Sequence, residues 1–477
     1  MHLPSWCVVD EALYVAYYHE YWKLHNGLDY NEKFMKTVAN QRAKHSRTFL
    51  EEGREPRRLF LKTLVDLSDA EKTNLVLKLE KAREEKIVTK KYSIDGTPVN
   101  WNNWRRFNAR AKRDKARKEV YDEFIKKTRL IAPLIRSLHE KSRRVHRHYG
   151  MDPLTTYLED EGLTLTRLKD LVTVLGKSAK APFLEDLYHY SKEILGGPAE
   201  YYDNLYYFRA KLFKTLDPIL EASHPAQEPL KVLKGLGFDV SKLQIDAEER
   251  ARKFASAECI PVQIPNDVRL LVRPVSPYED LSGSFHEFGH GMHFVSIDPS
   301  TAYENKYAIS ASVAEIFSEL LEDLLSNHDF LIKRLGISRK DTEEIAARRR
   351  FLELFFLVSY AANSLMKIDF WEENLSIEQA SERYAKYSKE FTDMEVPGEY
   401  WQLHHILPGY DMYVPSYLMA AVRMAELEQE LMGKFGSSWW KEPAAGDFIR
   451  DLVGSGAAID LASFSKLDSR VYLNRLS

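Results

Sequence analysis

A histidine pair enclosing a glutamate is the group of residues in this sequence most able to carry out chemistry. His286, Glu287 and His290 form an H-E-x-x-H motif. Residues four apart on a helix share a face, so both imidazoles can bind one divalent cation at about 2.0 to 2.1 Å. Glu287 would then lie beside the cation rather than on it. In that position its carboxylate can accept a proton from water whose pKa the cation lowers.

Apolar neighbours of this motif predict that its helix is largely buried. Phe285, Phe288, Met292 and Phe294 flank the two histidines. Buried imidazoles need polar partners, and one metal ion serves as a partner to both. A pair of histidines on a solvated surface is the alternative, which the apolar flanks disfavour. The sequence therefore predicts a metal centre on this helix.

A third metal ligand must come from another part of the chain. A catalytic zinc ion takes three protein ligands and keeps a fourth position open for water. The helix predicted over 308–325 carries Glu315, Glu319 and Glu322 on the face opposite its apolar residues. Such a glutamate stripe is often a solvated face, and spacing alone does not choose among the three. Zinc suits two histidines and one carboxylate with an open position, although the affinity order does not exclude cobalt or manganese.

The elements that must position these residues are mostly helices. Apolar residues recur at helical spacing over 10–84, and the basic stretch 105–147 predicts a pair of helices with a solvated face. Turn residues over 93–103 place a connection between them. Ile and Val residues broken by prolines over 260–275 predict a short β-hairpin at a sheet edge. Helices then resume, so the fold class is mainly α.

The metal motif and the glutamate stripe together resemble one peptidase family. His286–Met292 and the later Glu315–Glu322 are similar to the thimet oligopeptidase and oligoendopeptidase F family, in which H-E-x-G-H is followed by a glutamate ligand at this spacing. The resemblance implies that Glu315 is the third ligand, as in a gluzincin, and that each chain binds one zinc ion. Glu319, one turn later, is then expected to hydrogen-bond a ligand histidine. Substitution of Glu322 is expected to leave zinc binding unchanged.

Three further segments look like parts of the same family. Tyr201–Tyr207 and Asp246–Phe254 resemble family segments that precede the site. A later segment is similar to the family's H-x(4)-Y-x(6)-Y pattern and contains His405, Tyr410 and Tyr417. The resemblance implies that these three residues are catalytic, because phenol and imidazole donors stabilise the oxyanion that develops during peptide hydrolysis.

Other segments resemble the neighbouring carboxypeptidase Taq family, which shares the zinc chemistry and the helical fold. These segments are Asp267–Arg269, Arg273, Glu279–Asp280 and Tyr413–Tyr417. Phe288 and the glutamate stripe fit the oligopeptidase family better. We therefore expect a zinc oligoendopeptidase that cleaves short peptides, with a zinc carboxypeptidase as the alternative.

The resemblance implies an architecture of two helical lobes flanking a deep channel, with zinc on its floor and a small β-hairpin or sheet beside it. We expect residues 1–195 to form a helical lobe and residues 196–477 to form the catalytic lobe. An extended peptide would pair with the 260–275 edge as an added strand. A non-catalytic helical binding protein is the remaining alternative. Glu287 argues against it, because a structural metal site closes with four ligands and has no use for an adjacent base.

Composition limits the partners and the setting of the protein. The 477 residues are 44% hydrophobic and 29% charged, and the formal net charge is −3. This balance lacks the global basic field typical of nucleic-acid binding. Cys7 and Cys259 are the only cysteines, which excludes a disulfide framework. The apolar stretch Leu352–Ala362 is too short to cross a bilayer, and the first residues lack the pattern of a secretory signal. A cytoplasmic protein without membrane or nucleic-acid partners is expected, and its oligomeric state is not indicated.

Overall fold

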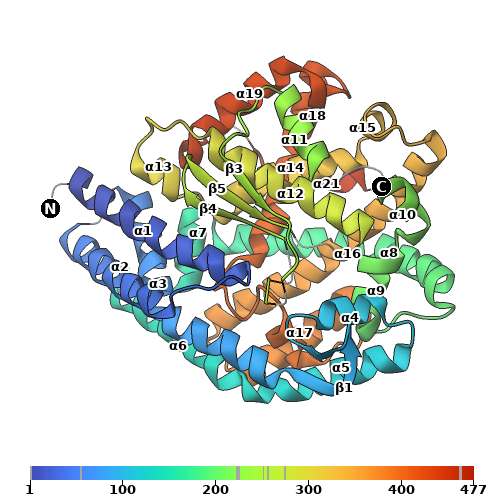
Figure 1. Cartoon of the computed structure of the whole chain (residues 1–477), viewed down its shortest axis with the longest axis horizontal. Helices are drawn as coiled ribbons and strands as arrows, with labels where there is room; N and C mark the ends of the chain where they lie inside the picture. The colour runs from blue at the N-terminus through green and yellow to red at the C-terminus, as the bar shows by residue number, and fades with distance from the viewer. Residues whose placement is uncertain are drawn as a thin grey trace. The chain divides into compact units, whose positions relative to one another are not determined.

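In the part of the chain that the structure describes, the protein is mainly helical and carries two small sheets, which confirms the predicted fold class (Figure 1). The computed structural model describes residues 3–53, 56–221, 226–250, 252–254, 257–272, 276–460 and 465–476. Arg273 and Val275, which the sequence placed in the Taq-like segments and the hairpin, lie outside these residues. The predicted channel between two lobes stays a prediction.

The chain divides into two compact units, each assembled from separated segments. The first unit contains Lys36–Leu212 and Phe351–Leu418. The second contains His2–Met35, Phe213–Arg350 and Met419–Ser477. The sequence placed one boundary between residues 195 and 196. In the structure the chain instead passes from one unit to the other at several points.

Long helices make up most of the first unit. Helix α3 packs along α6, and Gly176 of α8 allows a close approach to Ala361 and Phe391, because a Cβ there would lie 2.5 Å from the first and 2.6 Å from the second. The described elements of this unit include α3 (Arg57–Lys86), β1 (Val88–Ile94), β2 (Thr97–Asn100), α4 (Trp104–Arg110), α5 (Asp114–Lys127), α6 (Ala132–His148), α7 (Pro153–Asp160), α8 (Leu165–Leu195), α9 (Asn204–Tyr206) and α17 (Ile377–Thr392).

Two details of the first unit differ from the sequence expectation. The connection predicted over 93–103 includes a hairpin, in which β1 and β2 pair antiparallel around Asp95 and Gly96. Both turn residues have positive φ, 50° and 77°, as the tight turns of two-residue hairpins require. The basic stretch 105–147 forms three helices rather than a pair, because short breaks separate α4, α5 and α6.

The second unit holds the metal motif. Its described elements include α1 (Leu3–His25), α10 (Asp217–Glu221), α11 (Gln227–Gly235), α12 (Pro277–Ser296), α13 (Tyr303–Tyr307), α14 (Ala311–Glu322), α15 (His328–Lys333), α19 (Pro443–Gly454) and α21 (Ser469–Arg475). Three of the described helices contain a boundary between the two units. They are α2 (Glu32–Glu52), α16 (Arg339–Glu372) and α18 (Val414–Phe435).

The sheet of the second unit confirms the hairpin predicted from Ile260 onward. Strand β4 (Glu258–Gln263) pairs antiparallel with β5 (Asp267–Leu271), and β3 (Leu243–Asp246) pairs parallel with β5 on its other side. The strand order β3-β5-β4 makes β4 an edge strand, which suits its internal proline. Helix α1 packs on β4 around the buried Trp22, whose neighbours are Ile260, Val262 and Leu271.

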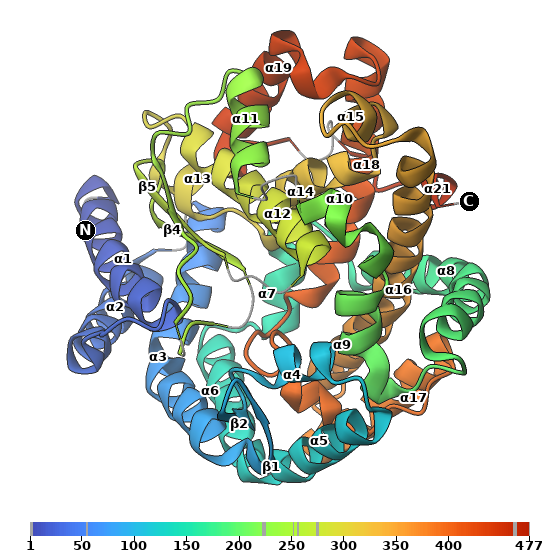
Figure 2. The ribbon, with the colours of Figure 1, turned by 45° about the vertical axis from the view of Figure 1, so that its right-hand side comes forward.

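Helix α12 lies between this sheet and α14, as the two views show (Figures 1 and 2). The H-E-x-x-H motif is therefore on a helix that is covered from both sides. The apolar stretch Leu352–Ala362 belongs to α16, the one helix among the described residues that is long and apolar enough to span a membrane. Within its most apolar window 72% of the residues are buried inside the protein, as is typical of a core helix.

Candidate metal centre

Local sequence explains why α12 forms and where it begins. Ser276 precedes the helix in an extended conformation, and Pro277 takes the first helical position, where a missing N–H costs nothing. Glu279 and Asp280 lie in the first turn and stabilise the positive end of the helix dipole. Of the apolar flanks predicted to be buried, Phe285, Phe288 and Met292 are buried, whereas Phe294 is partly exposed.

Two glycines, Gly289 inside the motif and Gly291 directly after it, allow the neighbouring elements to approach α12 closely. A Cβ on Gly289 would clash with the carbonyl oxygen of Phe317 and lie 2.5 Å from Cα of Ser318 on α14. A Cβ on Gly291 would lie 2.9 Å from the Leu243 side chain of β3. The helix that carries the histidines is thus held against the helix that carries the glutamates.

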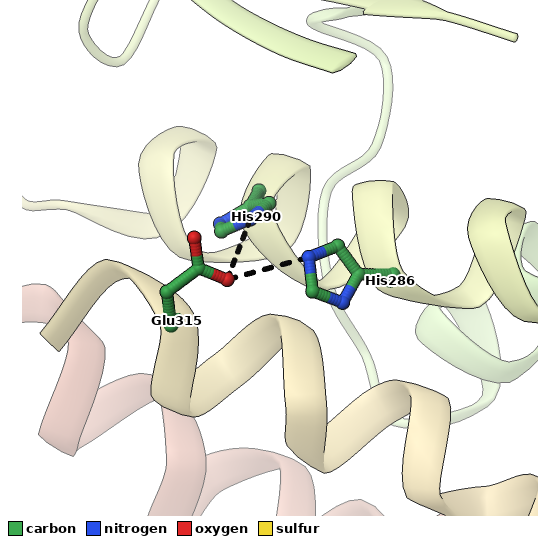
Figure 3. A group of neighbouring side chains, drawn as sticks. All are labelled: His286, His290 and Glu315. Atoms are coloured by element: carbon green, nitrogen blue, oxygen red, sulfur yellow. Dashed lines mark ion pairs between the residues drawn. The ribbon is translucent and has the colours of Figure 1, made fainter. Parts of the chain in front are cut away.

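This close packing brings His286, His290 and Glu315 together, as predicted (Figure 3). Oε2 of Glu315 lies 3.3 Å from Nε2 of His286 and 3.4 Å from Nε2 of His290. Two ligands at about 2.0 to 2.1 Å in tetrahedral directions around one zinc ion lie about 3.3 Å apart. The donor atoms therefore fit one small divalent cation, and one donor from each of the three residues lies within 4.8 Å of the others.

Charge and burial at Glu315 also suit a cation. The residue is 1% exposed, and Ser318 Oγ donates a hydrogen bond of 3.1 Å to its Oε2. Burial opposes ionisation of this carboxyl, but His290 and His286 outweigh it and hold the pKa of Glu315 well below its usual range. A buried carboxylate needs such positive partners, and a metal ion held by the three residues would be the strongest of them.

Glu322 orients the first histidine. Its Oε2 accepts a hydrogen bond of 3.0 Å from Nδ1 of His286, so the Nδ1 atom carries the proton and Nε2 is free to bind a metal. Ser282 Oγ donates to the same carboxylate, and Arg349 lies 3.5 Å from it. Burial opposes ionisation, yet His286 and Arg349 lower the pKa of Glu322 to about 2.

This orienting role was assigned to the wrong glutamate by the sequence, which favoured Glu319 and gave Glu322 no part. Glu322 follows Glu315 by seven residues, or two helical turns, and so shares its face. That spacing was the available signal. The lengthwise offset between α12 and α14, which decides which turn of α14 faces His286, is not encoded in the spacing of either helix.

Glu287 is buried and interacts electrostatically with all three ligand residues, so it lies near them as expected. Burial raises the pKa of its carboxyl above the ordinary value, and the two histidines only partly oppose this effect. Glu258 and Cys259, the first residues of β4, also interact electrostatically with Glu287. Edge strand β4 therefore borders the candidate centre.

The predicted oxyanion donors belong to the first unit, whereas the metal ligands belong to the second. Tyr410 is 46% exposed, and the ring of Tyr417 stacks on Tyr360 at 5.1 Å between centroids. His405 stacks on its neighbour His404 at 4.6 Å. Their part in catalysis stays a prediction.

No family model matches the sequence, but solved structures share its fold. A crystal structure named BsuCP aligns with a TM-score of 0.66 at 14% identity and covers 99% of this chain and 97% of that one. An M32 carboxypeptidase from Deinococcus radiodurans R1 aligns with a TM-score of 0.63 at 14% identity, covering 99% and 96%. A structure assigned to oligoendopeptidase F of Bacillus anthracis str. Ames gives 0.62 at 13% identity, covering 93% and 82%. The resemblance seen in the sequence is therefore confirmed at the level of the fold.

Proposed function

We propose that the protein is a zinc-dependent oligoendopeptidase that hydrolyses short peptides. One observation carries the proposal: Nε2 of His286, Nε2 of His290 and Oε2 of Glu315 converge at distances that suit one zinc ion, and Glu287 lies between the two histidines in sequence. A buried base beside a three-ligand set is typical of a catalytic rather than a structural zinc site. The fold shared with peptidases supports the same conclusion.

Each of these side chains would have its own role in peptide hydrolysis. His286, His290 and Glu315 hold the cation, which when bound polarises water and the peptide carbonyl. Glu287 accepts the proton of the attacking water and passes it to the leaving amine, for which its raised pKa is suited. Burial of the carboxylate excludes bulk water from this transfer.

The edge strand β4 is the proposed binding edge for the peptide. It begins at Glu258 and Cys259, next to Glu287. An extended peptide can add to such an edge through backbone hydrogen bonds, which depend little on side-chain identity. We propose that His405, Tyr410 and Tyr417 donate hydrogen bonds to the oxyanion.

A carboxypeptidase is the second candidate, and the extent of the structural alignments favours it. The chain covers 96% and 97% of the carboxypeptidase and BsuCP structures but only 82% of the oligoendopeptidase. A carboxypeptidase recognises the terminal carboxylate, most naturally with an arginine. The described candidate on β5, Arg269, already pairs with Asp267 at 2.6 Å. Another, Arg349, contacts Glu322 and donates to Tyr278 at 3.0 Å. The neighbours of Arg349 are also paired: Arg348 lies 3.0 Å from Glu344, and Arg350 donates to the backbone carbonyl of Leu476 at 2.7 Å. Because these described arginines already have partners within the protein, we favour endopeptidase action.

Cleavage of an amidated peptide distinguishes the two candidates. We expect a peptide of about ten residues with an amidated carboxyl terminus to be cut internally into two fragments, because its binding depends on the backbone. Mass spectrometry of the products gives the answer. Loss of single residues from the carboxyl end, abolished by amidation, would identify a carboxypeptidase. The activity of either kind should disappear on chelation and return with zinc, and cleavage that persists after verified metal removal would contradict both candidates.

A further inference from the structure

The segment 404–413 links the short helix Gly398–Leu403 to α18 and carries two of the proposed oxyanion donors, His405 and Tyr410. It is irregular, so it lacks the hydrogen-bond ladder that holds a helix or a strand in place. Its turns are closed by a few local hydrogen bonds, from the N–H groups of Ile406 and Leu407 to Nδ1 of His404 and from the Gly409 N–H to the Ile406 carbonyl. The placement of the segment on the helices depends on contacts outside it. The first unit provides them as a buried cluster of charged and polar side chains beneath the segment.

Asp411 is held from three helices. Nζ of Lys72 on α3 lies 3.1 Å from its Oδ2, and the Ser142 hydroxyl on α6 donates to the same oxygen. Trp371 on α16 donates its indole N–H to the Asp411 backbone carbonyl at 2.8 Å. Burial opposes ionisation, but Lys72, the two histidines His146 and His139 and the Ser142 hydroxyl together outweigh it and hold the pKa of Asp411 well below its usual range. Side chain and backbone of one residue are thus tied to the helical core.

Lys367 makes a second attachment four residues earlier. This side chain on α16 is 2% exposed, and its Nζ donates to the backbone carbonyl of Leu407 at 3.2 Å. It also lies 3.2 Å from Nε2 of His139, whose Nδ1 faces the carbonyl of Ile135 at 2.9 Å. Because Nδ1 must donate to that carbonyl, Nε2 accepts from Lys367. Burial lowers the pKa of Lys367 to about 7.

Such a cluster is a costly way to hold a loop. Charged groups removed from water are often replaced by apolar residues without loss of stability. The two buried lysines therefore suggest that the cluster serves to position the segment rather than to stabilise the protein. The neighbouring side chains differ in direction: Asp411 reaches Lys72 in the helical core, whereas Tyr410 is 46% exposed. Fixing Asp411 therefore also fixes the backbone from which Tyr410 projects.

We propose that Asp411 and Lys367 are positioning residues, which hold the segment 404–413 so that His405 and Tyr410 are preset for the oxyanion. The inference rests on the proposed peptidase function. Neither positioning residue touches the substrate. Preset donors cost no reorganisation during the reaction, and a displacement of about 1 Å can cost about 100-fold in rate.

The test compares Asp411→Asn with Asp69→Asn. The first change keeps the size of the side chain but removes the charge that Lys72 and Ser142 hold. The second removes another carboxylate from the same lysine, which lies 3.0 Å from Oδ1 of Asp69. Asp69 belongs to α3 and is exposed, so its loss leaves the segment attached. Lys367→Met, which removes the donor to Leu407, provides an independent variant if Asp411→Asn folds poorly.

Four quantities are measured on the full chain: kcat and KM for a fluorogenic peptide, bound zinc, and deuterium exchange of the 404–413 amides. We expect Asp411→Asn to lower kcat about 10- to 100-fold with KM within a few-fold and zinc unchanged. Amide exchange in the segment should rise about tenfold, while exchange in α12 stays as in the parent. Lys367→Met should behave in the same way, and Asp69→Asn should resemble the parent in all four quantities.

Parental kcat and exchange in both Asp411→Asn and Lys367→Met would overturn the proposal. Equal effects of Asp411→Asn and Asp69→Asn would also overturn it, because the cluster would then act only on stability. A parent protein that cleaves no peptide would instead contradict the proposed function. Deuterium exchange would still test the attachment of the segment in that case. Parental exchange of the 404–413 amides in both variants would then be enough to reject the attachment.

Discussion

The imidazole of His286 is held through its Nδ1 atom, which lies 3.0 Å from Oε2 of Glu322. Glu322 in turn is held by Ser282 from α12 and approached by Arg349 from α16. The ring can therefore present only Nε2 to the position it shares with His290 and Glu315. A carboxylate that orients a ligand histidine also raises its basicity.

This contact changes what we expect of the glutamates on α14. Glu315→Ala should abolish stoichiometric zinc binding, since it removes a ligand. Glu322→Ala should lower metal affinity or activity about 10- to 100-fold, although the sequence alone predicted no effect. Glu319→Ala should have a smaller effect than Glu322→Ala. Competition with a zinc-sensitive chelating dye measures all three, and unchanged affinity in Glu322→Ala would show that His286 keeps its orientation without this partner.

Glu287→Gln should keep the metal and lose nearly all turnover. The amide preserves the shape of the side chain but cannot accept the proton of the attacking water. Zinc content by elemental analysis and kcat on a fluorogenic peptide are the two measurements. Asp298→Asn, an exposed carboxylate just beyond the end of α12, is the matched control and should retain parental kcat. Near-normal turnover in Glu287→Gln would reject its role as the base.

Gly289→Ala should separate α12 from α14 and destabilise the protein. The added Cβ would clash with backbone atoms of Phe317 and Ser318, and overpacking of this kind costs about 1–3 kcal/mol. Gly283→Ala, in the same helix, is the control: its Cβ would lie 3.8 Å from the Ala257 side chain, an ordinary contact. That change should stabilise the helix by up to about 1 kcal/mol. Thermal unfolding distinguishes the two, and equal melting temperatures would contradict the close approach.

His293 should make the protein sensitive to acid. The ring is fully buried, and neither nitrogen has a hydrogen-bond partner among the residues that the structure describes. Burial, with a smaller contribution from His290, lowers the pKa of His293 to about 3 from its ordinary value of 6.5. The unfolded ring takes up a proton as the pH falls below 6.5, but the folded ring does not until about pH 3. The stabilising contribution is therefore complete above pH 6.5 and is lost as the pH falls toward 3.

At pH 5 this loss is about 2 kcal/mol relative to pH 7. His293→Phe should remove it, so the difference in unfolding free energy between pH 7 and pH 5 should shrink by that amount. Urea unfolding of both proteins at both pH values, in the presence of a chelator, measures the difference without a contribution from metal release. A constant packing cost of the phenyl ring cancels within each protein. An identical pH difference in parent and variant would show that the ring is not kept neutral.

Tyr410→Phe and Tyr417→Phe should lower kcat more than they raise KM, because a hydrogen bond formed only in the transition state acts in this way. At least one variant should lose about 100-fold or more. Steady-state kinetics at verified zinc occupancy measures the effect. If both variants stay within a few-fold of the parent, the two tyrosines serve packing, as the stacking of Tyr417 on Tyr360 would allow.

What the sequence determined by itself lies within single elements. The pairing of His286 with His290 follows from the fixed rise and twist of one helix, and apolar flanks sufficed to predict its burial. Proline-broken Ile and Val residues likewise predicted the hairpin that became β4 and β5. Glu315 needed more than periodicity, since three glutamates share one face of α14 and only the family resemblance chose among them.

Tertiary structure decided what depends on the offset between elements. Gly289 lets α14 approach until its carboxylates face the histidines, and that approach assigns Glu322 rather than Glu319 to His286. Asp411 meets Lys72 across 339 positions of sequence. Such contacts depend on how helices distant in the chain pack side by side. Helical periodicity constrains only which face of each helix is buried, so it leaves the sliding of one helix along another to side-chain packing.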